Sequence, residues 1–322
     1  MSEKATTNSL FDDVLKLLPK RPSKLDDMNN MIDWRPVKTL LNKHMKRVAN
    51  AVGKPAYPSL VMFKSLLLQR WYNLSDVGLE ERLFDSLSFR RFAGFGIMDS
   101  IPDATTICRF RNEMLGADLA EKLFGVISRQ LANWGQFKEG VCVDATVVSS
   151  SRRPHTTMEV IPEDRKEPDE PDVVVTHCDD TEAAWLKKGK KTYFGYKVHM
   201  ASDPQTGLVV CGHVTSANRS DMKGLEKVLE KLSEGTQGSC YADKGYSSAE
   251  NRNLVKRHGL EDAIMYKASR NKPLTEEERG RNKVISATRS RIEKIFGCFK
   301  RNLQFARSRY VGLVKVYQEF CL

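Results

Sequence analysis

The spacing of apolar residues changes near residue 139, and this change limits the folds that the chain can adopt. Before it, apolar side chains recur at helical intervals, for example Val61, Phe63 and Leu66 within 58–83, as expected for packed helices. After it, the apolar runs are short and rich in β-branched residues, beginning with 141–148, which is typical of strands. We therefore predict an α/β fold, with a mixed sheet flanked by helices and preceded by an all-helical N-terminal domain.

The order of the predicted elements gives the domain organisation. Three strands are followed by a helix, a strand, a helix, a strand and a long basic helix at 286–302. We predict a helical domain over 1–135, an α/β domain over 136–310 and a short C-terminal segment over 311–322.

Residues 152–182 fall outside this pattern. They contain four prolines, and ten acidic residues lie between Glu159 and Glu182. A segment of this composition has too few apolar groups to form a core of its own. We predict an exposed, mobile loop inserted between the first two strands.

The composition excludes several classes of protein. The seven cysteines form no C-x-x-C pair, so neither a zinc site nor a disulfide framework is indicated, and we expect a reduced, cytoplasmic protein. No apolar run approaches about 18 residues, so no membrane span is predicted. The net charge of +11 favours a polyanionic partner, because Lys and Arg release counterions from phosphates.

Three acidic residues stand in apolar or basic surroundings and are candidates for a metal site. Asp144 lies on the first predicted strand, Asp243 ends the fourth, and Glu293 lies on the long basic helix. A lone carboxylate on a packed strand is costly unless something offsets its charge. Carboxylates gathered from distant segments suit Mg²⁺ and phosphate chemistry. The ordinary alternative is that each Asp is a turn residue and the helical Glu is solvated.

Four motifs give these acids a context. They are VCVDATVVSS at 141–150, GKKTYFGYKVHMASDPQTGLVVCGHVTSANRSD at 189–221, YADKGY at 241–246 and RSRIEKIFGCFKR at 289–301. Together with the helical stretch 58–115, they resemble the DDE transposases of bacterial insertion sequences, specifically the insertion-sequence-five group within the insertion-sequence-four-like superfamily. The resemblance covers most of the chain from about residue 35 onward.

The resemblance implies a fold, an activity and a set of site residues. It implies an RNase H-like catalytic domain in which Asp144, Asp243 and Glu293 form the catalytic triad and bind two Mg²⁺ ions, with Mn²⁺ as a substitute. The implied activity is cleavage of DNA at the ends of an insertion sequence, followed by strand transfer into target DNA. The implied partners are the terminal inverted repeats, the target DNA and a second subunit, in a homodimer or larger assembly. The implied location is the bacterial cytoplasm, at the nucleoid, and the helical domain is expected to bind DNA or to dimerise.

Two features depart from the family pattern. The family signature places a Tyr three residues before Arg289, where this chain has Ser286, so the phosphate contact of that Tyr is not expected here. Family members also continue past the segment RYVGLVK at 309–315 into another helix, whereas this chain has only a short segment, which we expect to be a truncated C-terminus.

Basic residues near the proposed site are predicted to bind DNA. Segment 281–310 contains nine of them against a single acidic residue. Arg289 and Lys300 lie on the same helical face as Glu293, where they would hold the scissile phosphate. The full predicted DNA-binding set is Arg289, Lys300, Arg291, Lys294, Arg301, Lys187, Lys188, Lys190, Lys191, Arg109 and Arg111. The alternative is a solvated face for the lysines and simple helix packing for the last two arginines.

Three further residues receive structural interpretations. Asp221 is interpreted as a helix N-cap, with a fourth metal ligand as the alternative. His199 is interpreted as a structural histidine, with a catalytic base as the alternative. Trp185 is interpreted as a packing residue, with stacking on an unpaired base as the alternative.

Three functions fit these patterns. The favoured one is a DNA transposase that uses two-metal phosphodiester chemistry. The others are a metal-dependent nuclease on the same fold and a non-catalytic DNA-binding remnant that represses its own element. Only the first would join DNA ends to a target.

Overall fold

The computed structural model describes residues 23–45, 55–116, 118–134, 140–152, 157–160, 173–176, 180–232, 236–270 and 272–322. These residues divide into two compact units, which are described separately below. The first comprises Met1–Gln136 with Phe320–Leu322, and the second comprises Phe137–Glu319.

The first unit is helical, as predicted. Its helices are α2 (Lys24–Met31), α3 (Trp34–His44), α4 (Ser59–Trp71), α5 (Asp76–Asp85), α6 (Leu87–Ala93), α7 (Ala104–Gly116) and α8 (Leu119–Trp134). Helix α4 is buried along almost its whole length and forms the centre of the unit. Polar side chains fix the helix starts: Ser75 accepts a hydrogen bond at the start of α5, and Asp103 does so at the start of α7.

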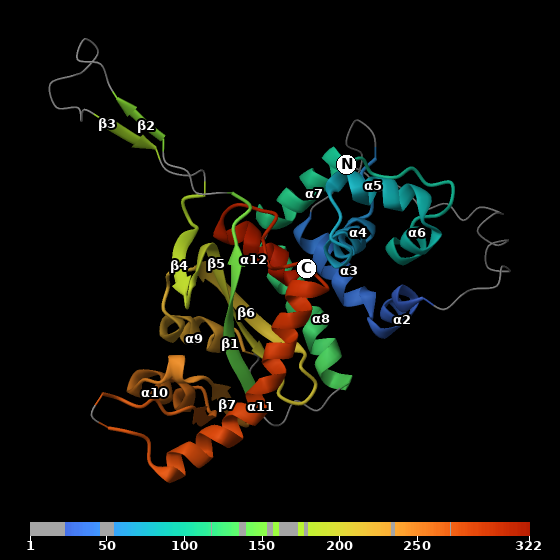
Figure 1. Cartoon of the computed structure of the whole chain (residues 1–322). Coiled ribbons are helices and arrows are strands. Elements are labelled where there is room, and N and C mark those ends of the chain that lie inside the picture. The colour runs from blue at the N-terminus through green and yellow to red at the C-terminus, as the bar shows by residue number, and fades with distance from the viewer. Residues whose placement is uncertain are drawn as a thin grey trace. The chain divides into compact units, whose positions relative to one another are not determined.

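The second unit is built on a six-stranded mixed sheet in the order β4-β5-β1-β7-β8, with β6 paired to β5 (Figure 1). The strands are β1 (Gly140–Ser149), β4 (Ala184–Lys188), β5 (Lys191–Ser202), β6 (Val209–Ser216), β7 (Ser239–Ala242) and β8 (Glu261–Ile264). Strand β1 runs antiparallel to β5 and parallel to β7, and β7 runs parallel to β8. This arrangement confirms the predicted mixed α/β fold.

Helices cover both faces of this sheet. Val143 and Ala242 belong to a core cluster with α9 (Asp221–Leu229) and α10 (Ala249–Arg257). Because side chains alternate along a strand, the residues between them face the other side. There Cys142 of β1 contacts the carbonyl of Thr288 on α11 (Glu276–Arg301), so α11 packs on that second face.

Four elements differ from the sequence prediction. Two short strands, β2 (Thr157–Val160) and β3 (Val173–Thr176), pair within the segment predicted to be a loop; most of the remainder of 152–182 lies outside the described residues. Strand β4 was not predicted. Helix α12 (Leu313–Cys321) occupies the segment that was expected to be short and truncated.

The long basic helix begins earlier than predicted. We expected it to start at residue 286, but α11 begins at Glu276 with a capping box in which Thr275 and Glu278 satisfy each other's backbone N–H groups. Among the described residues, no helix combines the length and the apolar character needed to cross a membrane.

Candidate active site

Asp144 and Asp243 are brought side by side by the register of two parallel strands. The pairing of β1 with β7 aligns Val143 with Ala242, and the next residue on each strand is one of the two aspartates. Neighbouring strands lie about 4.8 Å apart, and both aspartates follow the alternation onto the α11 face of the sheet. Two of the three predicted acids, 99 positions apart in the sequence, are therefore neighbours in the fold.

Asp144 is held by one arginine from α11. Its Oδ2 accepts a hydrogen bond from Arg289 Nη2 at 2.6 Å, and its Oδ1 accepts one from the Ala145 N–H at 2.8 Å. The side chains of Asp144 and Arg289 are only 19% and 9% exposed. Burial nevertheless raises the pKa of Asp144, with a contribution from the negative charge of Asp243, although Arg289 opposes the shift. Within the described part of the chain, Arg289 Nε has no hydrogen-bond partner.

Asp243 caps a short turn that ends in a buried tyrosine. Its Oδ1 accepts a hydrogen bond from the Gly245 N–H at the start of the 3₁₀ turn η2 (Lys244–Tyr246). Tyr246 is 1% exposed, and its hydroxyl finds no partner among the residues that the structure describes. Burial raises the pKa of Tyr246 well above its usual value, and the charges of Asp144, Asp221 and Asp243 add to the shift. The Tyr246 hydroxyl therefore lies within the field of three carboxylates.

Asp221 lies near the turn that follows Asp243, 3.7 Å from the position that a Cβ atom on Gly245 would occupy, although the predicted set of site residues leaves it out. Ser220 occupies the N-cap position of α9 without a side-chain capping bond, and Asp221 is the first helical residue. The preferred interpretation of Asp221 as an N-cap is therefore wrong. Its carboxylate instead pairs with Lys197 Nζ of β5 at 2.8 Å. The sequence signal is weak, because Asp221 lies five positions after the end of β6 and its partner lies 24 positions upstream.

Glu293 is not gathered with the two aspartates. It lies on α11 one turn beyond Arg289, and its side chain is exposed. Within the described ranges, no three His, Cys, Asp or Glu side chains are grouped closely enough to hold a metal ion. The third position of the predicted triad is thus on the correct helix but outside the immediate neighbourhood of Asp144.

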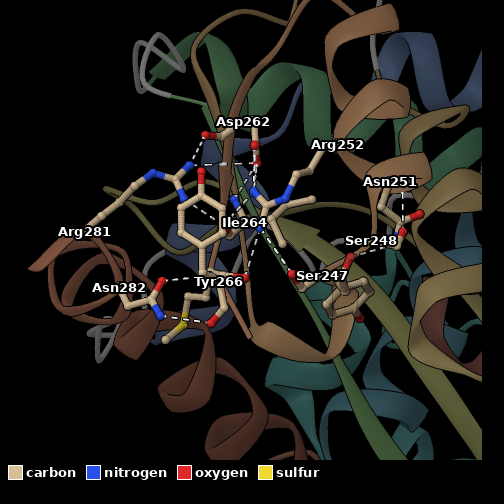
Figure 2. A network of polar contacts seen from close by, with 11 residues as sticks. Ser247, Ser248, Asn251, Arg252, Asp262, Ile264, Tyr266, Arg281 and Asn282 are labelled. Atoms are coloured by element: carbon tan, nitrogen blue, oxygen red, sulfur yellow. Dashed lines mark hydrogen bonds and ion pairs between the residues drawn. The ribbon is translucent and has the colours of Figure 1, made fainter. Parts of the chain in front are cut away.

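A polar network fixes the first half of α11 against the edge of the sheet (Figure 2). Arg252 of α10 pairs with Asp262 of β8 at 2.6 Å. Arg281 of α11 donates to the carbonyls of Asp262 and Ile264 at 2.5 and 3.0 Å. Both guanidinium groups lie within 5 Å of the Tyr266 ring centroid, at 4.4 and 4.7 Å, as cation–π contacts.

Two further contacts complete the anchoring of α11. Asn282 pairs with both backbone groups of Tyr266, accepting at 2.8 Å and donating at 3.0 Å. Arg291 donates to the carbonyls of Pro204 and Gln205 at 2.5 and 2.9 Å, in the turn between β5 and β6. These contacts lie on both sides of Arg289 in the sequence and fix the rotation of the helix that presents it to Asp144. Arg291, which we expected to bind DNA, uses one guanidinium nitrogen for this structural role.

The paired aspartates fit a divalent cation of the hard type. Carboxylate oxygens are the ligands that Mg²⁺ prefers, and it binds through one or two of them while keeping several waters. Asp144 is buried and partly desolvated beside Asp243, so two negative charges lie close together. A bound cation would reduce their repulsion. The donor chemistry therefore fits the metal predicted from the sequence, with Asp144 and Asp243 as the residues that would hold it.

Basic residues from two distant segments meet on the same unit. The pKa of Lys300 on α11 is lowered by burial and by the positive charge of Lys188 at the end of β4, so the two ammonium groups are close. Lys187, Lys190 and Lys191 are exposed on the same β4–β5 hairpin. Lys294 and Arg301 are also exposed on α11. Trp185 packs its ring on Phe194 at 5.4 Å, although the side chain remains largely exposed.

The two arginines predicted on α7 have different surroundings. Arg111 is buried and makes two hydrogen bonds to the carboxylate of Asp76, at 2.6 and 2.8 Å. Arg109 is exposed. The structure therefore gives Arg111 a packing role in the helical unit, because its guanidinium group is directed at an internal carboxylate, and leaves Arg109 available to a partner.

Comparisons with known proteins identify the family of this chain. Residues 135–322 match the family described as "Transposase DDE domain", and residues 12–113 match "Transposase domain (DUF772)". A transposase for insertion sequence element IS1106 from Neisseria meningitidis serogroup B is 38% identical over 211 residues, which cover 65% of this chain and 71% of the relative. A solved structure of the piggyBac transposase synaptic complex with hairpin DNA aligns with a TM-score of 0.41 and 12% identity, covering 92% of this chain and 74% of that one. The chain belongs to the DDE transposases of bacterial insertion sequences and is a DNA transposase.

Proposed function

We propose that this transposase cuts DNA at the ends of an insertion sequence and joins the freed 3′ end to target DNA at the site around Asp144 and Asp243. The observation that carries the proposal is the strand register, which places these two carboxylates together on the face covered by the basic helix α11. Transposase DDE domains are generally dependent on a divalent metal. We assign Mg²⁺, with Mn²⁺ as a substitute, and two ions in the reacting complex.

Each residue of the site has a distinct proposed role. Asp144 and Asp243 would hold the metal, which when bound activates the attacking oxygen and stabilises the leaving oxygen at phosphorus. Arg289 orients Asp144 through Nη2, and its Nε, which has no partner among the described residues, would be the donor to a phosphate oxygen. Glu293 is the third proposed acid. It lies on α11 four residues after Arg289, with its side chain exposed.

The surrounding basic residues would bind the DNA backbone. Lys188 and Lys300 form a like-charged pair whose repulsion a phosphate would relieve. The exposed residues Lys187, Lys190, Lys191, Lys294, Arg301 and Arg109 complete the proposed contact set. We propose that the partners are the terminal inverted repeats and target DNA, and that two subunits synapse two ends.

The proposal is tested with Asp243→Asn and DNA carrying the ends of the element. Cleavage in the presence of Mg²⁺ should disappear, whereas end-specific binding should persist, because the variant removes a metal ligand and no basic group. Glu250→Gln, an exposed acid on α10, is the matched control and should cut normally. Undiminished cleavage by Asp243→Asn would refute the site assignment.

A joining assay separates the proposed activity from the two alternative functions. A transposase yields strand-transfer products with target DNA, whereas a plain nuclease on the same fold yields cut ends alone. A non-catalytic remnant would bind the ends without cutting them, even as the unmodified protein.

A further inference from the structure

A basic loop leaves the sheet beside the two aspartates. Strand β8 continues its pairing with β7 for one residue beyond Ile264, because the Met265 N–H donates to the Ala242 carbonyl at 3.0 Å. Met265 is therefore level with Asp243, which is in turn level with Asp144 on β1. Neighbouring strands lie about 4.8 Å apart, so the loop starts about 10 Å from Asp144.

This β8–α11 loop, residues 266–275, carries three unopposed positive charges. It contains Lys267, Arg270 and Lys272 and no acidic residue, and all three basic side chains are exposed. Ser269 and Lys272 exchange backbone hydrogen bonds at 3.2 Å, which makes a tight turn around Arg270. In the described part of the chain, none of the three basic side chains forms an ion pair or a hydrogen bond.

Both ends of the β8–α11 loop are fixed. At its start, the guanidinium groups of Arg252 and Arg281 contact the Tyr266 ring, and both also pair with the carboxylate of Asp262 (Figure 2). At its end, the capping box of α11 holds the last residue of the loop. Two guanidinium groups share one carboxylate, so the network adds positive charge at the root of the loop. A loop held in this way loses little conformational freedom on binding a ligand.

The ordinary explanation of such a loop is a solvated connection, but two observations favour a ligand. The loop lies at the carboxyl ends of the parallel strands β1, β7 and β8, which is where ligands bind in open α/β sheets. Its cations also lack the carboxylate partners that an exposed lysine elsewhere in the unit has, since Lys227 on α9 pairs with Glu230 at 3.0 Å. Free cations at the edge of the sheet that carries the site are suited to an anionic ligand.

We propose that Lys267, Arg270 and Lys272 bind the DNA phosphate backbone close to the reacting phosphate, and that the network around Tyr266 fixes the loop that carries them. This inference rests on the proposed function, because it assigns DNA phosphates to a loop beside the proposed site. Lys and Arg bind phosphate oxygens through charge-assisted hydrogen bonds and release counterions from DNA. The three residues bind and orient the DNA, and they contribute no group to the reaction.

The test measures the affinity of the full-length protein for a duplex that carries the end of the element, at several salt concentrations. The double variant Lys267→Gln with Arg270→Gln should weaken binding about 10-fold and reduce the slope of log affinity against log salt by about two, because two phosphate contacts are lost. The matched control is Lys256→Gln with Arg257→Gln, which removes one lysine and one arginine from the exposed end of α10, before the opposite end of β8. The control should keep the affinity and the slope of the unmodified protein.

A second arm distinguishes the element end from the target as the source of the phosphates. Complexes assembled at saturating concentration on pre-cut ends are given target DNA, and the joined product is measured. Weaker binding in the first arm assigns the loop to the element end, whereas normal end binding with reduced joining assigns it to target DNA. In either case, the single-turnover cleavage rate at saturating DNA should stay within a few-fold of that of the unmodified protein.

The outcomes separate this inference from the function on which it rests. If the loop variant shows no loss in either arm, or no greater loss than the control, while Asp243→Asn abolishes cleavage, the loop has no role in binding and the proposed function stands. Undiminished cleavage by Asp243→Asn would instead overturn the proposed site itself.

Discussion

Two arginine–aspartate pairs, one in each unit, have the same N–O distance and equally buried arginines but different surroundings. Arg111 with Asp76 and Arg289 with Asp144 both have an N–O distance of 2.6 Å, and both arginine side chains are 9% exposed. Asp76 accepts two bonds from Arg111 and a third from Gln69 Nε2 at 2.6 Å. It also lies in the first turn of α5, where the helix dipole favours a negative charge.

The pair at the sheet is less complete. Arg289 gives Asp144 one hydrogen bond, its Nε is unpartnered within the described residues, and Asp243 places a second negative charge nearby. This difference indicates that a buried ion pair by itself does not identify a ligand-binding site. An ion pair in which hydrogen-bonding groups remain unsatisfied does. Four predictions test this contrast.

The largest effect is expected for cleavage by Asp144→Asn. Loss of the carboxylate should reduce Mg²⁺-dependent cutting of end-bearing DNA on the order of 10³-fold or more, which corresponds to about 4 kcal/mol. The same substitution at the pair in the helical unit, Asp76→Asn, should leave the cutting rate per folded molecule within a few-fold. Single-turnover cleavage under matched conditions measures both rates, and equal losses in the two variants would contradict the contrast.

The free energy of unfolding should change more in Asp76→Asn than in Asp144→Asn, which is the opposite of the order expected for cleavage. Asp76→Asn leaves Arg111 buried without a counter-charge and should lower the free energy of unfolding by about 3 kcal/mol. Asp144→Asn also removes the counter-charge of Arg289, but it should lower the free energy of unfolding by less, because burial and Asp243 already disfavour the charged form of Asp144. Urea unfolding at neutral pH without divalent metal is the measurement. A loss in Asp144→Asn as large as that in Asp76→Asn would show that the pair at the sheet is structural.

His199 is a buried titratable residue on the face of the sheet opposite Asp144, and it provides a further comparison with the site. Its Nε2 bonds Thr215 Oγ1 at 3.1 Å, its ring packs against Gly224, and burial lowers its pKa to about 4. The contribution of the neutral His199 imidazole to the free energy of unfolding is therefore complete above pH 6.5. It is lost as the pH falls toward 4. Between pH 7 and pH 5 the loss should be about 2 kcal/mol.

Substitution separates this titration from those of other groups. His199→Gln should flatten the dependence between pH 7 and pH 5, whereas His258→Gln, at an exposed position, should preserve it. Urea unfolding at a series of pH values checks this expectation. A slope that survives in His199→Gln would mean that another group controls stability in this range.

The smallest effect is expected for the like-charged pair of lysines. Lys300→Gln should weaken binding of end-bearing DNA about three-fold and reduce the salt dependence of the affinity by about one counterion. Lys256→Gln, an exposed lysine on α10, is the control and should leave the salt slope unchanged. Titrations at several salt concentrations distinguish the two variants. An unchanged slope for Lys300→Gln would remove it from the proposed contact set.

Local patterns predicted much of the fold and two of the three acids. The runs that became β1 and β6 are rich in β-branched residues, and the short apolar run before Asp243 became β7; Asp144 lies within the first of these strands and Asp243 follows the last. Strand β4 was missed because its apolar run, 184–186, is only three residues long, contains no β-branched residue and is followed at once by two lysines. The start of α11 was missed because the capping signal at Thr275 and Glu278 precedes a polar stretch.

The remaining parts of the site depend on contacts between distant segments. No spacing rule joins Lys197 to Asp221 or Arg111 to Asp76, because each pairing is set by how separate elements pack. The position of Glu293 depends on the rotation of α11, which the contacts of Arg281, Asn282 and Arg291 determine. The sequence motif predicted correctly that Glu293 lies on the long basic helix, but a motif cannot predict the distance of that residue from the sheet.

The most direct test of the central claim locates the metal in the protein itself. Fe²⁺ with ascorbate and peroxide produces radicals that cut the polypeptide next to a bound ion. We predict cuts in β1 near Asp144 and in the turn after Asp243, both suppressed by excess Mg²⁺ and by Asp243→Asn. Cuts confined to the helical unit, or cuts at these two segments that persist in Asp243→Asn, would contradict the account.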